Sequence, residues 1–553
     1  MVAPSPRAAG PSEALILFLF VVLGVVLFAP ILGSFFLADD FTLLEAVRKG
    51  GPLGAWWRGA SFFRPLVSIS LYVDHAVSGL RPFGFHLTNV LAHAGCAFLV
   101  YRVTAALPLD RLTALLAGIA FLTLPAHSEP VAWISGRTDV LAALGGLFAL
   151  DCYLRFRLGG RRRLLLWALV LSFIGLCAKE SVIPLCGIIF FADLLLVRPP
   201  SARPRRAHWL LGTLSFLAVA SAYLLIRRAV LGKWIGGYGA AVHLNKDPML
   251  LGANLMLYPL RTLLAQLPTA VFPPDIPTTG VQQAVAEVLR RSLPIAALRG
   301  LCVLVVLAAG GLGWLALRGA RKRLSRPQAL TLGFLVVATY LALLPVLNLS
   351  VSLLNSDGER FLYFPSAFAV MALVALLRFV LPTVFCQRMA FALLLLFYVV
   401  MLNYSNSHWR AAGRLSERLI AQLRREPAEP PLLLANLPDS IGGAFVFRNS
   451  HEAALRLFDP TPREVFVLTR HTLLHVEDEV AVTRAKGVLA VQLLEPRDYF
   501  YSITPPPPGT AVSGEYVVQT QGRTGCTLQL PQRSYALRFY SGGALHPVAM
   551  NAN

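Results

Sequence analysis

Long apolar segments separated by short polar stretches make up the first 404 residues. The first, Leu15 to Leu37, is too long for the apolar core of a secretory signal and has no small-residue cleavage site beyond it, so it predicts a retained membrane helix. Ten later segments approach the length that a helix needs to cross a bilayer: 84–106, 110–126, 138–156, 163–179, 181–197, 208–228, 294–318, 328–349, 363–382 and 389–404. We therefore expect a mostly α polytopic protein with about eleven transmembrane helices.

Residues 405–553 have a different pattern. They are charged and rich in proline, with short strand-like runs at 465–468, 489–494 and 516–519 and a tract of four prolines at 505–508. This pattern predicts a small C-terminal α/β or β domain outside the bilayer. The expected organisation is a membrane domain at 1–404 followed by a second domain at 405–553.

The composition agrees with this division. Of 553 residues, 56% are hydrophobic and 14% are charged, whereas soluble proteins carry roughly 25% charged residues. The net charge of +21 comes largely from clusters that contain no acid, at 155–163, 198–206 and 318–326. Such clusters are typical of cytoplasmic loops and are attracted to anionic lipid headgroups. A nucleic-acid-binding surface would need interleaved aromatic residues on a folded domain, so we expect membrane lipid and no nucleic acid as a partner.

The basic clusters also predict the orientation of the chain. With the N-terminus in the cytoplasm, every cluster falls inside if 229–293 makes no net crossing. That stretch has an apolar piece at 249–267 beside several prolines, and we expect a re-entrant or surface-lying helix there. The outer loops are then 38–83, 127–137, 229–293 and 350–362, and the C-terminal domain lies on the same outer face.

These outer segments carry polar residues that orientation alone does not require. Ionisable groups at membrane depth cost several kcal/mol unless they are paired or face a cavity, so they are candidates for function. A carboxylate can activate an acceptor hydroxyl, and arginine or lysine can stabilise a departing phosphate. The candidates are Asp39, Asp40, Arg64, His86, His127, Glu129, Arg137, Asp139, Lys179, Glu180, Glu359, Arg360 and Tyr363.

Each candidate also has a structural interpretation. The acidic pair could cap a surface helix that runs from Phe41. The two histidines could be hydrogen-bonded core residues, and Tyr363 could belong to an interfacial aromatic belt. Charged neighbours could hold helix ends together as pairs, namely Arg137 with Asp139 and Lys179 with Glu180. Their gathering on one face, rather than any single residue, favours a functional site.

Six blocks of these residues occur in an order and spacing that resemble a known family. They are Asp39-Asp40, Phe63–Leu66, Gly84–His93, Pro125–Asp139, Ala178–Glu180 and Glu359–Ser366. Over roughly residues 30–400 the chain resembles the GT-C superfamily of membrane glycosyltransferases, most closely the membrane part of the transmembrane-and-tetratricopeptide O-mannosyltransferases and their bacterial relatives. The resemblance implies a GT-C-like fold and inverting transfer of a sugar from dolichyl or undecaprenyl phosphate on the outer face.

The resemblance also implies roles for the candidates. The first-loop acids supply the catalytic carboxylate, with Asp39 the expected base and Asp40 the second choice. The remaining candidates hold the donor phosphate and the acceptor. No tetratricopeptide repeats are visible, so the acceptor, whether protein, glycan or lipid, is not carried over. Because Asp39-Asp40 is not a D-x-D metal site, no cofactor is expected, although a divalent metal is used by some members of the superfamily.

Other functions remain open at this stage. A transporter or flippase for the same polyprenyl lipid would have inverted repeats and polar residues near mid-membrane, whereas these candidates gather towards the outer ends of the helices. A polysaccharide polymerase or ligase would share much of this layout, and a catalytically silent scaffold would tolerate loss of Asp39. The short loops and arginine-rich clusters favour a bacterial inner membrane, with the active site and the C-terminal domain facing the periplasm.

Overall fold

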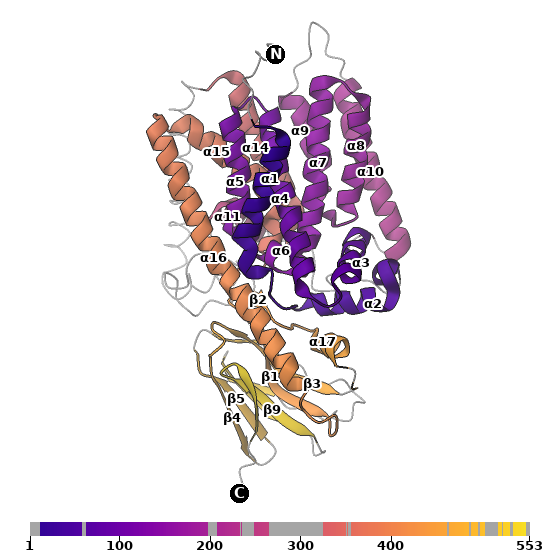
Figure 1. The fold of residues 1–553 in the computed structure, drawn as a ribbon, viewed down its shortest axis with the longest axis vertical. Helices are drawn as coiled ribbons and strands as arrows, with labels where there is room; N and C mark the ends of the chain where they lie inside the picture. The colour runs from indigo at the N-terminus through magenta and orange to yellow at the C-terminus, as the bar shows by residue number, and fades with distance from the viewer. Residues whose placement is uncertain are drawn as a thin grey trace.

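The structure is a computed structural model of the whole chain. It describes residues 11–57, 62–196, 207–232, 234, 248–264, 324–349, 351 and 355–548, with gaps at 460, 462–463, 486–487, 496–497, 504–517, 522–523 and 531–534. A bundle of helices stands on a smaller domain built mainly of strands, and one long helix, α16, passes from the first into the second (Figure 1).

Ten of the eleven predicted spans correspond to helices, and the segment 294–318 lies outside the described residues. The helices of the bundle are α1 (Glu13–Phe28), α4 (Pro82–Ala106), α5 (Arg111–Thr123), α7 (Arg137–Gly159), α8 (Arg162–Leu176), α9 (Leu185–Leu195), α10 (Ala207–Leu231), α11 (Pro248–Leu263), α14 (Arg326–Leu343), α15 (Tyr363–Val380) and α16 (Val384–Leu423). Among the described residues six helices are long and apolar enough to cross a membrane, or seven if α5 and the bent segment after it form one span. The chain is a multi-pass membrane protein, but the predicted count of about eleven spans is not confirmed.

The number of candidate spans among the described residues is smaller than predicted for a physical reason. Helices α8 and α9 have 15 and 11 residues, fewer than the roughly 20 that span a bilayer without assistance. Helix α7 is long enough but carries charged side chains near both ends. It packs closely on α8, because a Cβ added at Gly145 would lie 2.6 Å from the Cα of Gly175. Small residues of this kind allow membrane helices to approach at backbone distance.

The segments that carry the candidates lie at the end of the bundle next to the C-terminal domain. Two helices, α2 (Asp39–Trp57) and α3 (Pro65–Ser78), fold from what the sequence predicted as an outer loop. Short turns η2 (Pro125–His127), α6 (Ser128–Ala132) and η3 (Ile134–Gly136) join α5 to α7, while η4 (Glu180–Val182) and η7 (Glu359–Leu362) join later helices. Figure 1 shows α2, α3 and α6 at this end, with the visible start of the chain at the other.

The C-terminal domain is a small, mostly β domain with one short helix, α17 (His451–Phe458). One sheet has the order β10-β9-β1-β3-β6 with β2 paired to β1, and a second has the order β4-β5-β8-β7. The strands are β1 (Leu432–Ile441), β2 (Ala444–Phe445), β3 (Val465–Leu473), β4 (Val480–Ala485), β5 (Val488–Leu493), β6 (Phe500–Ile503), β7 (Val518–Gln521), β8 (Gly525–Gln529), β9 (Ala536–Ser541) and β10 (Ala544–Pro547). The central strand β1 is buried along its whole length, as expected for a parallel strand covered on both faces.

The three predicted strand-like runs overlap β3, β5 and β7. The division expected at residue 404 falls inside α16, which continues without a break for 40 residues to Leu423. The second half of this helix packs on β1, β2 and β10. The membrane part and the C-terminal domain therefore share one continuous element.

Candidate functional site

The two acids of the first loop occupy different environments although they are adjacent. Both lie in the first turn of α2, where the free amides of a helix N-terminus favour negative charge. Asp39 is exposed, whereas Asp40 is buried. The Asp40 carboxylate accepts hydrogen bonds from the backbone amide of Leu37 at 3.0 Å and from the amide and hydroxyl of Ser135 at 2.8 and 2.5 Å.

These contacts decide against a simple capping role for the pair. The helix begins at Asp39 rather than Phe41, and the Asp40 carboxylate bonds backwards to Leu37 and across to Ser135 rather than forward to the helix amides. The Asp39 carboxylate makes no hydrogen bond or ion pair with the part of the chain that the structure describes. Asp40 therefore anchors the loop, and Asp39 presents a carboxylate to the outside.

The burial of Asp40 predicts a pH dependence of stability. Burial raises its pKa from 3.8 to about 7, although the bonds from Ser135 and Leu37 oppose the shift. A carboxyl whose pKa is higher in the folded state stabilises the fold fully below its ordinary pKa, and this contribution is lost as the pH rises through about 7. We expect the melting temperature of wild type relative to Asp40→Asn to be higher at about pH 5 than at about pH 8. An equal difference at both pH values would contradict the raised pKa.

The backbone before the acids is held from several elements. His86 on α4 contacts the carbonyl of Ser34 through Nε2 at 2.9 Å. Ser416 on α16 donates to the carbonyl of Phe36 at 3.0 Å, and the indole of Trp133 donates to the carbonyl of Leu37 at 3.3 Å. His86, predicted as a substrate contact, is thus placed to position the loop.

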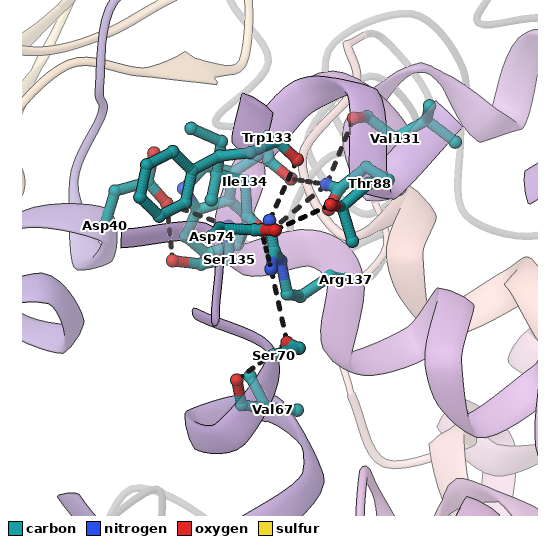
Figure 2. Close-up of polar contacts among 12 residues, drawn as sticks. Asp40, Val67, Ser70, Asp74, Thr88, Val131, Trp133, Ile134, Ser135 and Arg137 are labelled. Atoms are coloured by element: carbon teal, nitrogen blue, oxygen red, sulfur yellow. Dashed lines mark hydrogen bonds and ion pairs between the residues drawn. The ribbon is translucent and has the colours of Figure 1, made fainter. Parts of the chain in front are cut away.

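A buried ion pair, Arg137 with Asp74, lies near Asp40 (Figure 2). Arg137 donates to the Asp74 carboxylate at 2.6 Å, to the Ser70 hydroxyl at 3.2 Å and to the carbonyl of Phe85 at 2.9 Å. Asp74 also accepts from the Thr88 hydroxyl at 2.7 Å. These contacts connect α3, α4 and α7 and satisfy a charge that would otherwise be costly to bury.

The amide of Asn89 on α4 completes this arrangement. Its Nδ2 donates to the carbonyls of Val131, Trp133 and Ile134 at 3.0 to 3.3 Å. The turn that supplies Ser135 to Asp40 is thereby fixed to α4. Asn89 and Asp74 were not among the predicted site residues. The signal for Asp74 was the single acid in the mostly apolar run Leu66 to Val77, where a charge needs a partner.

The alternative in which sequence neighbours form ion pairs is not what the structure shows. Lys179 contacts both carboxylate oxygens of Asp139 at 2.6 and 2.7 Å, and Arg137 pairs with Asp74. Residues one or two positions apart on a helix do not face each other, so Arg137 and Asp139 reach different partners. Lys179 also lies 4.9 Å from the ring centre of Phe361, which brings the turn after α8 close to η7.

Two more ion pairs connect η7 to other elements. Glu129 on α6 accepts from the backbone amide of Arg360 at 2.8 Å and pairs with its guanidinium. Glu359 pairs with Arg261 of α11, a cation that the sequence analysis missed because 249–267 was treated only as an apolar piece. Arg360 also lies 5.2 Å from the ring centre of Trp133. Helix α11 is thus packed into the bundle at the level of the site.

The remaining histidine and tyrosine candidates belong to the core. His127 contacts the carbonyl of Phe121 and the hydroxyl of Ser366, both at 2.8 Å. Tyr363 contacts Nδ1 of His93 at 2.6 Å, and all four side chains in these two contacts are buried. The structure places His127 and Tyr363 in positions that join α4, α5 and α15. His127 is thus a hydrogen-bonded core histidine, and Tyr363 is a buried core residue rather than part of an interfacial aromatic belt.

Arg64 and Glu180 form the last part of the site. Arg64 precedes α3 and lies 4.1 Å from the ring centre of Phe62. Burial raises the pKa of Glu180, but the charges of Arg64, Lys179 and Arg227 outweigh that effect and the pKa falls below its usual value. This position is rich in positive charge. These cations can balance the charge of a bound anion in addition to the charge of Glu180.

No group of three or more histidine, cysteine, aspartate or glutamate side chains among the described residues is arranged to hold a metal ion. The carboxylates that lie closest to the site are instead engaged by arginine, lysine and serine, as in the pairs of Glu129 with Arg360 and Asp139 with Lys179. The sequence left open whether a divalent metal binds, and we assign no described residue as a ligand for one.

Part of the chain is similar in sequence to protein O-mannosyl-transferases. Protein O-mannosyl-transferase TMTC2 of Mus musculus is 43% identical over 93 residues, which is 17% of this chain and 11% of the relative. Protein O-mannosyl-transferase Tmtc1 of Drosophila melanogaster is 33% identical over 155 residues, which is 28% of this chain and 17% of the relative. The matched part is thus under a fifth of either relative, and no family model matches the chain.

Among solved structures, the archaeal oligosaccharyltransferase AglB from Archaeoglobus fulgidus, in complex with an inhibitory peptide and a dolichol-phosphate, aligns with a TM-score of 0.43 and 13% identity. The alignment covers 76% of this chain and 62% of that one. The predicted resemblance to transmembrane-and-tetratricopeptide O-mannosyltransferases is confirmed by the curated relatives, which are glycosyltransferases of the GT-C type.

Proposed function

We propose that this protein is an inverting glycosyltransferase that moves a sugar from a polyprenyl-phosphate donor to a hydroxyl acceptor on the extracytoplasmic face. The proposal is supported by the named relatives, which are O-mannosyltransferases, and by a site at the end of a membrane-embedded bundle. At this end a polyprenyl lipid can keep its tail in the bilayer while its phosphate and sugar reach the loops.

The observation that carries the proposal is the exposed carboxylate of Asp39 beside the anchored carboxyl of Asp40. A general base must reach the proton of the acceptor hydroxyl, and Asp40 already uses both of its oxygens within the protein. Asp39 therefore acts as the base, and Asp40 fixes the loop that presents it. Attack on the anomeric carbon by the activated hydroxyl then displaces the phosphate in one step, which inverts the configuration.

Cations at the same end support departure of the phosphate. Arg64 and Arg360 are only partly buried, and an arginine can bind two phosphate oxygens at once. Arg137 and Lys179 are buried, so their role is to fix the helices that carry the site, whereas Arg360 stays partly exposed although it pairs with Glu129. Arg64 and Arg360 are our candidates for donor contact.

The orientation proposed from the sequence accompanies this function. Arg155 and Arg157 lie near the C-terminal end of α7, and Arg161 to Arg163 lie at the start of α8. In Figure 1 the helices α7 and α8 meet at the end of the bundle away from the C-terminal domain. Under the positive-inside rule that end faces the cytoplasm. The site and the C-terminal domain then face the periplasm of a bacterial inner membrane. As a separate part of the proposal, transfer needs no metal cofactor.

An assay that follows both the lipid and the sugar tests the function against a transporter. Membranes containing the protein receive a panel of polyprenyl-phosphate sugars and an envelope extract as acceptor. Transfer predicts that the donor is converted to free polyprenyl phosphate while sugar appears on the acceptor. Movement of intact donor across the bilayer without loss of its sugar would identify a transporter and overturn the proposal.

A further inference from the structure

Val446 and Phe447, which follow β2 in the C-terminal domain, contact the first loop on both sides of Asp39. The backbone amide of Ala38 donates to the carbonyl of Val446 at 2.8 Å. The amide of Val446 donates in turn to the carbonyl of Asp439 at 2.8 Å. The residue before the proposed base is thus hydrogen-bonded to the edge of the main sheet of the C-terminal domain.

The two neighbours of Val446 contact Phe41, directly after the acidic pair, and Trp133. Phe447 stacks on Phe41 with ring centres 6.1 Å apart and planes at 27°. Phe445 packs edge-on against Trp133 with ring centres 5.1 Å apart, and Trp133 donates to the carbonyl of Leu37. The consecutive residues 445–447 therefore reach the loop just before and just after Asp39.

The backbone is strained on both sides of this contact. Among the described residues only Ala38 and Arg448 are non-glycine residues with positive φ, at 44° and 46°. The left-handed conformation costs an L-residue free energy, so it persists only where its surroundings enforce it. The hydrogen bond from Ala38 to Val446 is one such constraint, and the conformation of Ala38 sets the direction in which α2 starts at Asp39.

The turn between β1 and β2 is held against the membrane helix α16. Gly442 and Gly443 form a two-residue hairpin with φ of 52° and 88°, the geometry that favours glycine at both positions. A Cβ added at Gly442 would lie 2.9 Å from the ring of His408 on α16. The turn is therefore packed directly on the helix that also donates, through Ser416, to the carbonyl of Phe36.

We propose that the 439–448 hairpin of the C-terminal domain positions the catalytic loop, with Val446 holding Ala38 in its left-handed conformation so that Asp39 is aimed at the acceptor. This inference rests on the proposed function. It makes the C-terminal domain part of the transferase site rather than an appended module. Its residues act through Ala38 and are positioning residues.

A second hairpin of the same sheet supplies a matched control. Gly542 and Gly543 join β9 to β10 in the same two-residue geometry, with φ of 55° and 85°. A Cβ added at Gly542 meets nothing within 4 Å. Gly442→Ala and Gly542→Ala therefore impose the same backbone strain, but only the first displaces a turn from α16.

The test measures transfer per folded molecule together with amide exchange of the peptide that contains Ala38, both on the full-length protein in nanodiscs. We expect Gly442→Ala to lower kcat by about tenfold or more with little change in the donor KM, and to speed exchange at Ala38. Gly542→Ala should stay within about twofold of wild type in both measurements. Adding Ala38→Gly to Gly442→Ala should restore part of kcat, because glycine adopts positive φ without the enforcing contact.

Equal kcat and equal exchange for both glycine variants would overturn the proposal, and so would a loss of kcat that Ala38→Gly does not relieve. A purely structural role for the hairpin would reduce the amount of folded protein without changing kcat per folded molecule. If wild type transfers no sugar, the proposed function fails, and the exchange at Ala38 alone decides whether the hairpin holds the loop.

Discussion

Asp39→Asn is expected to lower kcat for sugar transfer by about 10²- to 10⁴-fold, the range that a positioned general base contributes. The amide keeps the size of the side chain but cannot accept the acceptor proton. Because Asp39 is exposed and its carboxylate has no hydrogen bond or ion pair among the described residues, the substitution should leave the fold and the expression level unchanged. The measurement is the initial rate of transfer at saturating donor in membranes matched for protein amount.

Two variants control this result. Glu452→Gln removes an exposed carboxylate from α17 and should keep wild-type activity. Asp40→Asn should affect stability and its pH dependence more than Asp39→Asn does, since Asp40 is bonded to Leu37 and Ser135. Full activity in Asp39→Asn together with loss in Asp40→Asn would make Asp40 the base and reverse our assignment.

The second large effect is on stability. Asp74→Ala is expected to lower the free energy of unfolding by about 3–5 kcal/mol, the cost of leaving a buried partner uncompensated. Arg137, the partner, has a side chain that is 1% exposed and pairs with Asp74 at 2.6 Å. Thermal unfolding of the detergent-solubilised protein, followed by a probe in the membrane part, measures the loss.

A pair at the other end of the bundle gives the comparison. Asp110 also pairs with an arginine, Arg378, at 3.0 Å, but its side chain is 54% exposed. Asp110→Ala should cost only about 1 kcal/mol, mainly from its lost helix cap. The double replacement of Asp74 and Arg137 by apolar residues should cost less than Asp74→Ala alone. An Asp74→Ala protein as stable as the Asp110→Ala protein would show that Arg137 does not depend on this pair.

Periodicity and charge placement predicted the helices well, because each helix is specified by its own residues. Ten of eleven predicted segments are helical, and the strand runs overlap β3, β5 and β7. Pairing could not be predicted in the same way, since it depends on which helices pack together. Arg137 reaches Asp74 across 63 positions and Arg360 reaches Glu129 across 231. A single sequence does not indicate which residues pair at such separations.

The same limit explains which roles of the candidate residues could not be assigned from the sequence. The residues alone named Asp39 and Asp40 together, and only the family resemblance favoured Asp39 as the base, because Asp40 is held partly by hydrogen bonds from Ser135, 95 positions away. Sequence reasoning treated 38–83 as a loop, although Pro65 begins the helix that carries Asp74. The contact from Val446 to Ala38 involves only backbone atoms, which leave no side-chain signature in the sequence.

The most direct test of the account is the source of the transferred sugar. Purified protein in nanodiscs receives one radiolabelled sugar in two forms, linked to polyprenyl phosphate or to a nucleoside diphosphate, with an envelope extract as acceptor. We predict that wild type moves label from the lipid-linked donor alone and that Asp39→Asn moves almost none. Transfer from the nucleotide donor, or equal transfer from the lipid donor by wild type and Asp39→Asn, would contradict the account.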